Sequence, residues 1–129
     1  MDASLTVLRL YSTASGASCF GSYAIPRELR DFAPPAAHLY ASEKMASASY
    51  VLVRLPAGWV GERHRSPRRQ ILFCLSGQVR ITPGVGGPRT LGVGGAWLME
   101  DTEGDGHKTE VISDGPFDAV IIQLPESAH

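Results

Sequence analysis

The chain has 129 residues, and its 12 lysine and arginine residues nearly balance 13 aspartate and glutamate residues. This length suits a single domain, here residues 1–129, that buries a core without disulfides or a structural metal. The balanced charge argues against a nucleic acid or a membrane surface as partner. No stretch approaches the roughly 20 consecutive apolar residues that span a bilayer.

The two cysteines and the first residues of the chain indicate in which cellular compartment the protein is expected. Cys19 and Cys74 lie far apart and show neither metal-ligand spacing nor a disulfide framework, so they read as small buried residues in a reducing environment. Asp2 comes early, and no basic start precedes an apolar run, so no signal peptide is expected. We therefore expect a cytoplasmic protein.

Short apolar, β-branched runs alternate with turns rich in the 14 glycine and nine proline residues. Along the chain, we expect a strand at 5–11, a loop at 12–18, a single helical turn at 26–32 and a linker at Pro34-Pro35. This spacing indicates an all-β sandwich or barrel, with an N-terminal arm over about 1–45 and a core over about 46–125. The core strands are expected at 49–55, 70–75, 78–82, 96–99, 108–112 and 117–124.

The strand that begins at Gln70 is apolar on both faces. Because side chains alternate along a strand, Gln70 would share one face with Leu72 and Cys74, and Ile71 would share the other with Phe73. A strand of this composition is expected inside a two-layer barrel. Gln70 would then be the polar end of an inward-facing row.

Charged residues form two clusters of opposite sign, each next to a histidine. Each cluster repels itself, and folding that brought the two together would relieve that repulsion. A run of charge is also the usual composition of a solvated loop, so both interpretations stand. The basic cluster is Arg63, Arg65, Arg68 and Arg69 around His64, and the acidic cluster is Glu100, Asp101, Glu103 and Asp105 before His107.

The first of these regions resembles the first motif of the cupins. In that motif His-x-His, three or four residues, a Glu, six residues and a Gly supply a metal site. His64 and Gly77 match this pattern, but Ser66 stands at the position of the second His and Gln70 at that of the Glu. The layout is kept, and half of the usual ligands are replaced.

The acidic region resembles the second cupin motif, which runs Gly, five residues, Pro-x-Gly, two residues and His. Segment 95–107 is similar, with Asp101 in place of the Pro and one extra residue before His107. The resemblance covers roughly residues 5–125 and narrows to a bacterial subgroup of small single-domain cupins, mostly of unknown function. The features shared with that subgroup are Trp59, Pro-Arg-Arg-Gln at 67–70, Leu-Ser-Gly at 75–77, Glu-Asp-Thr at 100–102 and Gly-His at 106–107.

The resemblance implies a double-stranded β-helix (jelly-roll) barrel, and cupin habit favours a homodimer. A second indication of a dimer is the irregular N-terminal arm, which could add a strand to the sheet edge of a neighbouring chain.

His64, Gln70 and His107 are the candidate metal ligands. Two imidazoles and an amide oxygen leave open coordination positions and are compatible with Zn, Fe, Mn, Ni or Cu. Gln is neutral and a weaker ligand than Glu, so the affinity should be lower than at a standard cupin site. The alternative is that both histidines are structural or line a pocket without metal.

Five further residues have a functional and a structural interpretation. Glu100 and Asp101 are candidate catalytic acid–base groups, or one of them is a fourth metal ligand. The structural alternative is that this pair caps a loop and forms salt bridges with Arg68 or Arg69. Arg68 and Arg69 are candidates to bind an anionic ligand group, or they are those ion-pair partners. Trp59 either forms the floor of the ligand pocket or is a buried residue of the hydrophobic core.

Two functions of different class follow from these residues. The first is a small-molecule site at the barrel mouth with a divalent metal, in a candidate enzyme acting on an oxygen-bearing substrate. The second is a metal-free ligand-binding or sensory module without turnover. A scaffold role for the barrel is the third interpretation.

Overall fold

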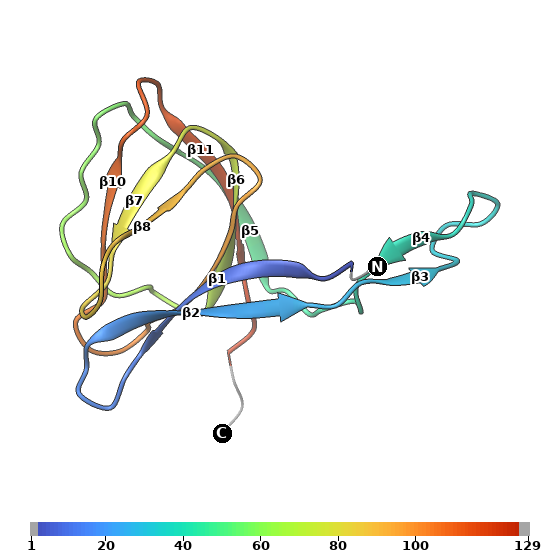
Figure 1. The fold of residues 1–129 in the computed structure, drawn as a ribbon, viewed down its shortest axis with the longest axis horizontal. Helices are drawn as coiled ribbons and strands as arrows, with labels where there is room; N and C mark the ends of the chain where they lie inside the picture. The colour runs from blue at the N-terminus through green and yellow to red at the C-terminus, as the bar shows by residue number, and fades with distance from the viewer. Residues whose placement is uncertain (1–2, 127–129) are drawn as a thin grey trace.

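A computed structural model describes residues 3–126, which form 11 strands and no helix. Two sheets face each other, and a separate hairpin projects from them (Figure 1). The expected all-β fold is confirmed. The large sheet has the order β2 (Ser18–Ile25), β1 (Leu5–Ser12), β9 (Ala96–Glu100), β6 (Gln70–Ser76), β11 (Phe117–Gln123), β5 (Ser49–Leu55).

The small sheet closes the barrel opposite the large one. Its strands lie in the order β10 (Lys108–Val111), β7 (Val79–Thr82) and β8 (Arg89–Leu91). Pairing is antiparallel except between β1 and β9, which run parallel. The main core lies between the sheets, because both inner faces carry apolar side chains that burial removes from water. Its buried members include Leu10, Leu72, Val79, Ile81, Trp97 and Phe117.

The predicted alternation along β6 is confirmed. Leu72 and Cys74 belong to the main core between the sheets, whereas Ile71 and Phe73 pack against a second cluster on the outer face of the large sheet. That second cluster contains the buried residues Val7, Ile25, Ala96 and Leu98. The large sheet is therefore apolar on both faces.

The hairpin of β3 (Glu28–Arg30) and β4 (Leu39–Ala41) extends away from the barrel (Figure 1). The single helical turn expected at 26–32 is wrong, because this segment contains β3. Leu29 pairs with Tyr40, and the Arg30 guanidinium donates to the Ala41 carbonyl at 3.1 Å, so cross-strand contacts replace helical ones. Pro34-Pro35 lies in the connection between the two strands.

The strands expected from the sequence are present within one or two residues, and four strands were missed: β2, β3, β4 and β8. The part of the chain expected as an N-terminal arm is divided, since β1 and β2 are members of the large sheet and only the segment around β3 and β4 projects. Within residues 3–126 the structure has no helix that could cross a membrane.

Candidate functional site

His64 and His107 lie side by side although they are 43 positions apart in sequence. Their backbones form an antiparallel bridge in which each amide N–H donates to the other residue's carbonyl, at 3.0 and 2.9 Å. The imidazole ring centroids are 5.0 Å apart, with 50° between the ring planes. The two histidines of the cupin-like motifs therefore meet, as the sequence predicted.

Gly106 makes this close approach of the two segments possible. Its φ is +75°, a region that L side chains rarely adopt. A Cβ at this position would lie 2.1 Å from the His64 carbonyl oxygen, so no other residue fits without moving the backbone. The Gly-His pair at 106–107 thus has a physical reason: glycine lets the neighbouring histidine reach His64.

Each imidazole is fixed through its Nδ1 atom. His107 is 3% exposed, and its Nδ1 donates to an Asp101 carboxylate oxygen at 2.5 Å. His64 lies at the surface, and its Nδ1 donates to the Glu62 carbonyl at 2.9 Å. Because both acceptors hold a hydrogen on Nδ1, the Nε2 atom of each neutral ring carries a free lone pair. Metal-ligating histidines typically have such an oxygen acceptor behind the ring.

Asp101 is fully buried behind His107. One of its carboxylate oxygens accepts from His107, and the other accepts from the Ser66 hydroxyl at 2.7 Å. The Ser66 amide also donates to the Asp101 carbonyl, at 3.1 Å. Ser66, which stands where the cupin motif has its second His, therefore supports His107 indirectly by holding Asp101 in place.

Both imidazoles line a cavity of about 150 Å³ between the two sheets. Gln70 and Trp59 line the same cavity. Four of the eight candidate site residues selected from the sequence therefore share one cavity. The rest of the lining is almost entirely apolar: Val53, Leu55, Leu72, Trp97, Met99, Thr109, Phe117 and Ile121.

Gln70 is buried and already engaged. Its side-chain NH₂ donates to the Met99 sulfur at 3.3 Å, and its carbonyl oxygen accepts from the Gln123 amide at 3.5 Å. An amide carbonyl oxygen has two lone pairs, so one remains for a ligand in the cavity.

Trp97 adds a polar group that the sequence did not single out. Its side chain is 2% exposed and lies edge-on to the His107 ring, with centroids 5.1 Å apart. Its indole N–H has no hydrogen-bond acceptor among the described residues. A buried donor without an acceptor costs about 1–3 kcal/mol, which an acceptor on a ligand or a water would recover. Strand alternation was the available signal, because Trp97 and Met99 share the inward face of β9.

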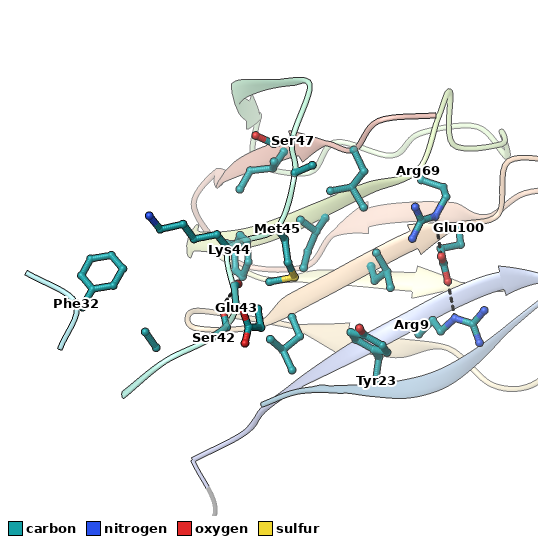
Figure 2. A pocket seen from close by; sticks show the side chains of 18 residues that line it. Arg9, Tyr23, Phe32, Ser42, Glu43, Lys44, Met45, Ser47, Arg69 and Glu100 are labelled. Atoms are coloured by element: carbon teal, nitrogen blue, oxygen red, sulfur yellow. Dashed lines mark hydrogen bonds and ion pairs between the residues drawn. The ribbon is translucent and has the colours of Figure 1, made fainter. Parts of the chain in front are cut away.

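Glu100, next to Asp101 in sequence, lies on the opposite face of the sheet and does not line this cavity. Its carboxylate accepts from Arg9 at 2.5 Å and from Arg69 at 2.8 Å (Figure 2). Burial alone would raise the pKa of Glu100, but the hydrogen bonds from Arg9 and Arg69 and their positive charges hold the pKa below its usual value. Glu100 is thus the ion-pair partner of Arg69, which was the structural interpretation of this residue.

The arginines also lie outside the cavity of the two histidines. Arg68 donates twice to the Leu124 carbonyl, at 3.2 and 2.7 Å, and so fastens the end of the segment after β11. Arg69 lines a separate groove on the outer face of the large sheet. Neither guanidinium is placed to bind an anion inside the barrel.

The donor set at the barrel mouth is small. Across residues 3–126 no group of three or more His, Cys, Asp or Glu side chains is arranged to hold a metal ion. A metal there would have the two imidazole Nε2 atoms and the Gln70 amide oxygen as protein ligands.

Comparison with known proteins gives the fold. No protein-family model and no curated protein matches the chain. The Schizosaccharomyces pombe Cnp3 cupin domain is similar with a TM-score of 0.50 and 11% identity, over 96% of this chain and 84% of that chain.

Two further solved structures match with lower TM-scores. The Drosophila melanogaster CENP-C domain has a TM-score of 0.46 and 15% identity, over 93% of this chain and 77% of that one. A conserved Streptococcus pyogenes protein of unknown function, SPY1581, has a TM-score of 0.45 and 20% identity, over 67% of this chain and 72% of that chain. The bacterial subgroup indicated by the sequence motifs stays a prediction. The two facing sheets and the likeness to Cnp3 show that this chain has the all-β fold of a cupin domain.

Proposed function

We propose that the protein binds a small molecule at the mouth of its barrel, with His64 and His107 contacting the polar end of that molecule. The observation that carries this proposal is that the two rings lie side by side, each held at Nδ1 and each lining the cavity. Ligand sites typically pair apolar walls with a few fixed polar groups. The cavity of about 150 Å³ is smaller than the ~300–1,000 Å³ of most ligand sites, so it suits a very small ligand or one end of a larger one.

We further propose that a divalent transition metal is held by the Nε2 atoms of His64 and His107, with the Gln70 carbonyl oxygen as third ligand. Neutral imidazoles suit Zn, Fe, Ni and Cu, and an oxygen ligand extends the set to Mn. The Asp101 carboxylate behind His107 supports this assignment, since such partners orient a ligating ring and raise its basicity. Such a metal would act as a Lewis acid on an oxygen of the bound molecule.

Any catalytic role of Asp101 would be exerted through His107, because the carboxylate is fully buried and its oxygens already accept from His107 and Ser66. Asp101 is then a positioning residue that fixes which nitrogen of His107 faces the cavity. Glu100 would act only on the groove at the outer face, where its two arginine partners hold it.

Metal-free binding is the second candidate, and Trp97 favours it. An indole N–H cannot ligate a metal, but it can donate to an oxygen of a bound molecule, as the free Nε2 atoms can accept from a hydroxyl or an amide. A small ligand with both donor and acceptor groups would satisfy the hydrogen-bonding groups of Trp97, His64 and His107 without a metal.

Metal titration separates the two candidates. We expect the untagged protein, purified without chelator, to bind about one equivalent of Zn²⁺ in calorimetry, and His64→Ala and His107→Ala each to abolish this binding by removing one of two imidazoles. His38→Ala is the matched control, because His38 is exposed on the projecting hairpin segment. Less than about a tenth of an equivalent of any of the five metals after reconstitution, or full binding by either variant, would overturn the metal site.

A further inference from the structure

The outer face of the large sheet carries a groove that is separate from the histidine cavity. Its volume is about 600 Å³, within the ~300–1,000 Å³ of most small-molecule sites. Side chains of the sheet form its floor, and segment 41–47, which leads from β4 toward β5, forms the facing wall (Figure 2). The apolar residues of the floor are Ile25, Ile71, Phe73, Leu98, Ile122 and Leu124. The groove therefore has the size and the apolar walls of a ligand site.

One end of this groove carries two arginines that share a single carboxylate. Glu100 accepts from the Nε atom of Arg9 at 2.5 Å and from the Nε atom of Arg69 at 2.8 Å, so both of its oxygens are occupied (Figure 2). Burial raises the pKa of Glu100, but the two arginines outweigh burial and hold that pKa below its usual value. The carboxylate is therefore ionised at neutral pH, and the cluster of three side chains keeps one positive charge in excess.

The two guanidiniums have donors left for a ligand. Each arginine uses its Nε for Glu100, so within the described residues 3–126 its terminal Nη1 and Nη2 groups have no acceptor in the protein. Arg9 is also held by Tyr11, whose ring centre is 4.4 Å from the guanidinium carbon. The side chains of Arg9 and Arg69 are 40% and 38% exposed, so a molecule in the groove can reach them. Arginine donors suit an acceptor with two oxygens in one plane, such as a carboxylate.

The rest of the groove does not cancel this positive charge. Its other charged lining residues are Glu43 and Lys44, one of each sign, and both belong to segment 41–47. Glu43 is already paired with Arg30, at 2.9 Å. The groove thus combines an apolar floor with a positively charged end.

We infer that this groove binds an aliphatic monocarboxylate, with its hydrocarbon chain on the apolar floor and its carboxylate on the Nη groups of Arg9 and Arg69. A carboxylate brings one negative charge, which matches the excess charge of the cluster, whereas a phosphate monoester brings about −1.5 to −2. Each methylene that the floor buries should strengthen binding roughly fourfold. This ligand is distinct from the one proposed for the histidine cavity, because the two sites lie on opposite faces of the large sheet.

Calorimetric titration of the full chain with decanoate tests this site. We expect saturable binding of one equivalent of decanoate. Hexanoate should bind roughly 100-fold more weakly, because it has four fewer methylenes to bury. The alcohol 1-decanol has the same chain without the charge, so it should bind roughly 10-fold more weakly than decanoate or worse.

Two substitutions at the charged end have opposite expected effects. Arg69→Gln removes one guanidinium, so it should weaken decanoate binding by roughly 10-fold and leave 1-decanol binding unchanged. Glu100→Gln removes the competing negative charge and keeps an amide oxygen that accepts from the arginines, so it should strengthen decanoate binding several-fold. An ion pair with only a structural role would instead give weaker decanoate binding, or no change, in both variants.

Arg80→Gln is the matched control, because Arg80 is exposed on β7 of the small sheet and does not line the groove. This variant should bind decanoate as the wild-type protein does, and circular dichroism should show the same fold for all three variants. Zinc binding at His64 and His107 should also be the same in all three, so the two sites are tested separately. Absence of saturable decanoate binding, 1-decanol binding as tight as that of decanoate, or equal losses in Arg69→Gln and Arg80→Gln would each overturn the inference.

Discussion

Gly106→Ala is expected to lower the free energy of unfolding by about 3 kcal/mol or more and to abolish binding at His64 and His107. Two costs combine in this variant. The backbone at φ +75° disfavours any Cβ by about 1–2 kcal/mol, and the added Cβ would meet the His64 carbonyl at 2.1 Å, so the bridge between the histidines must open. Chemical denaturation followed by circular dichroism gives the free energy, and zinc titration gives the binding.

Gly86→Ala is the matched control, because it separates the two costs. Gly86 has φ +90°, but a Cβ there meets no heavy atom within 4 Å. It should therefore show the backbone cost alone, about 1 kcal/mol, with unchanged zinc binding. Equal destabilisation by the two alanines would mean that Gly106 is not required for the contact between His64 and His107.

Asp101→Ala is expected to cost about 3–5 kcal/mol of stability, as the removal of one partner from a buried polar pair does. The Ser66 hydroxyl and the His107 Nδ1–H would both lose their acceptor inside the protein. The His107 ring would no longer be held in one tautomer, so any zinc that still binds should bind about 10–100-fold more weakly. Denaturant unfolding and zinc calorimetry measure the two effects.

Two milder variants show whether the effect passes through His107. Ser66→Ala removes only one hydrogen bond to Asp101, so it should cost about 1 kcal/mol and leave zinc affinity nearly unchanged. Asp101→Asn keeps one oxygen that can still accept from His107, so it should restore most of the binding lost in the alanine variant. Zinc affinity that falls as far with Ser66→Ala as with Asp101→Ala would show a purely structural role for Asp101.

The sequence predicted the parts of the fold that depend on local pattern. Alternation along 70–75 correctly divided Leu72 and Cys74 from Ile71 and Phe73, because one face of β6 packs on the barrel core and the other on the outer cluster. β2 was missed because serine and glycine interrupt its apolar pattern, and its place is fixed by pairing with β1. Segment 26–32 was misread because long-range pairing, not local propensity, decides a strand of three residues.

The candidate site could likewise be predicted only where its residues belong to a local sequence motif. The motif spacing led to His64, Gln70 and His107, and these three residues share one cavity. Glu100 and Asp101 were treated as one acidic pair, although consecutive residues at the end of a strand point to opposite faces. The partners of Asp101 come from 35 positions earlier and six positions later, so only the folded chain shows that it supports His107.

We propose that the Nε2 atoms of His64 and His107 are the atoms that bind a ligand or metal at the barrel mouth. Two-bond ¹⁵N–¹H correlation spectra of protein labelled with ¹⁵N-histidine test it directly, because they assign the hydrogen to one nitrogen of each ring. We expect Nδ1–H rings at both residues, and the addition of Zn²⁺ should shift their Nε2 signals while the signals of His38 stay in place. Rings that carry the hydrogen on Nε2, or Nε2 signals that do not respond to Zn²⁺, would contradict the account.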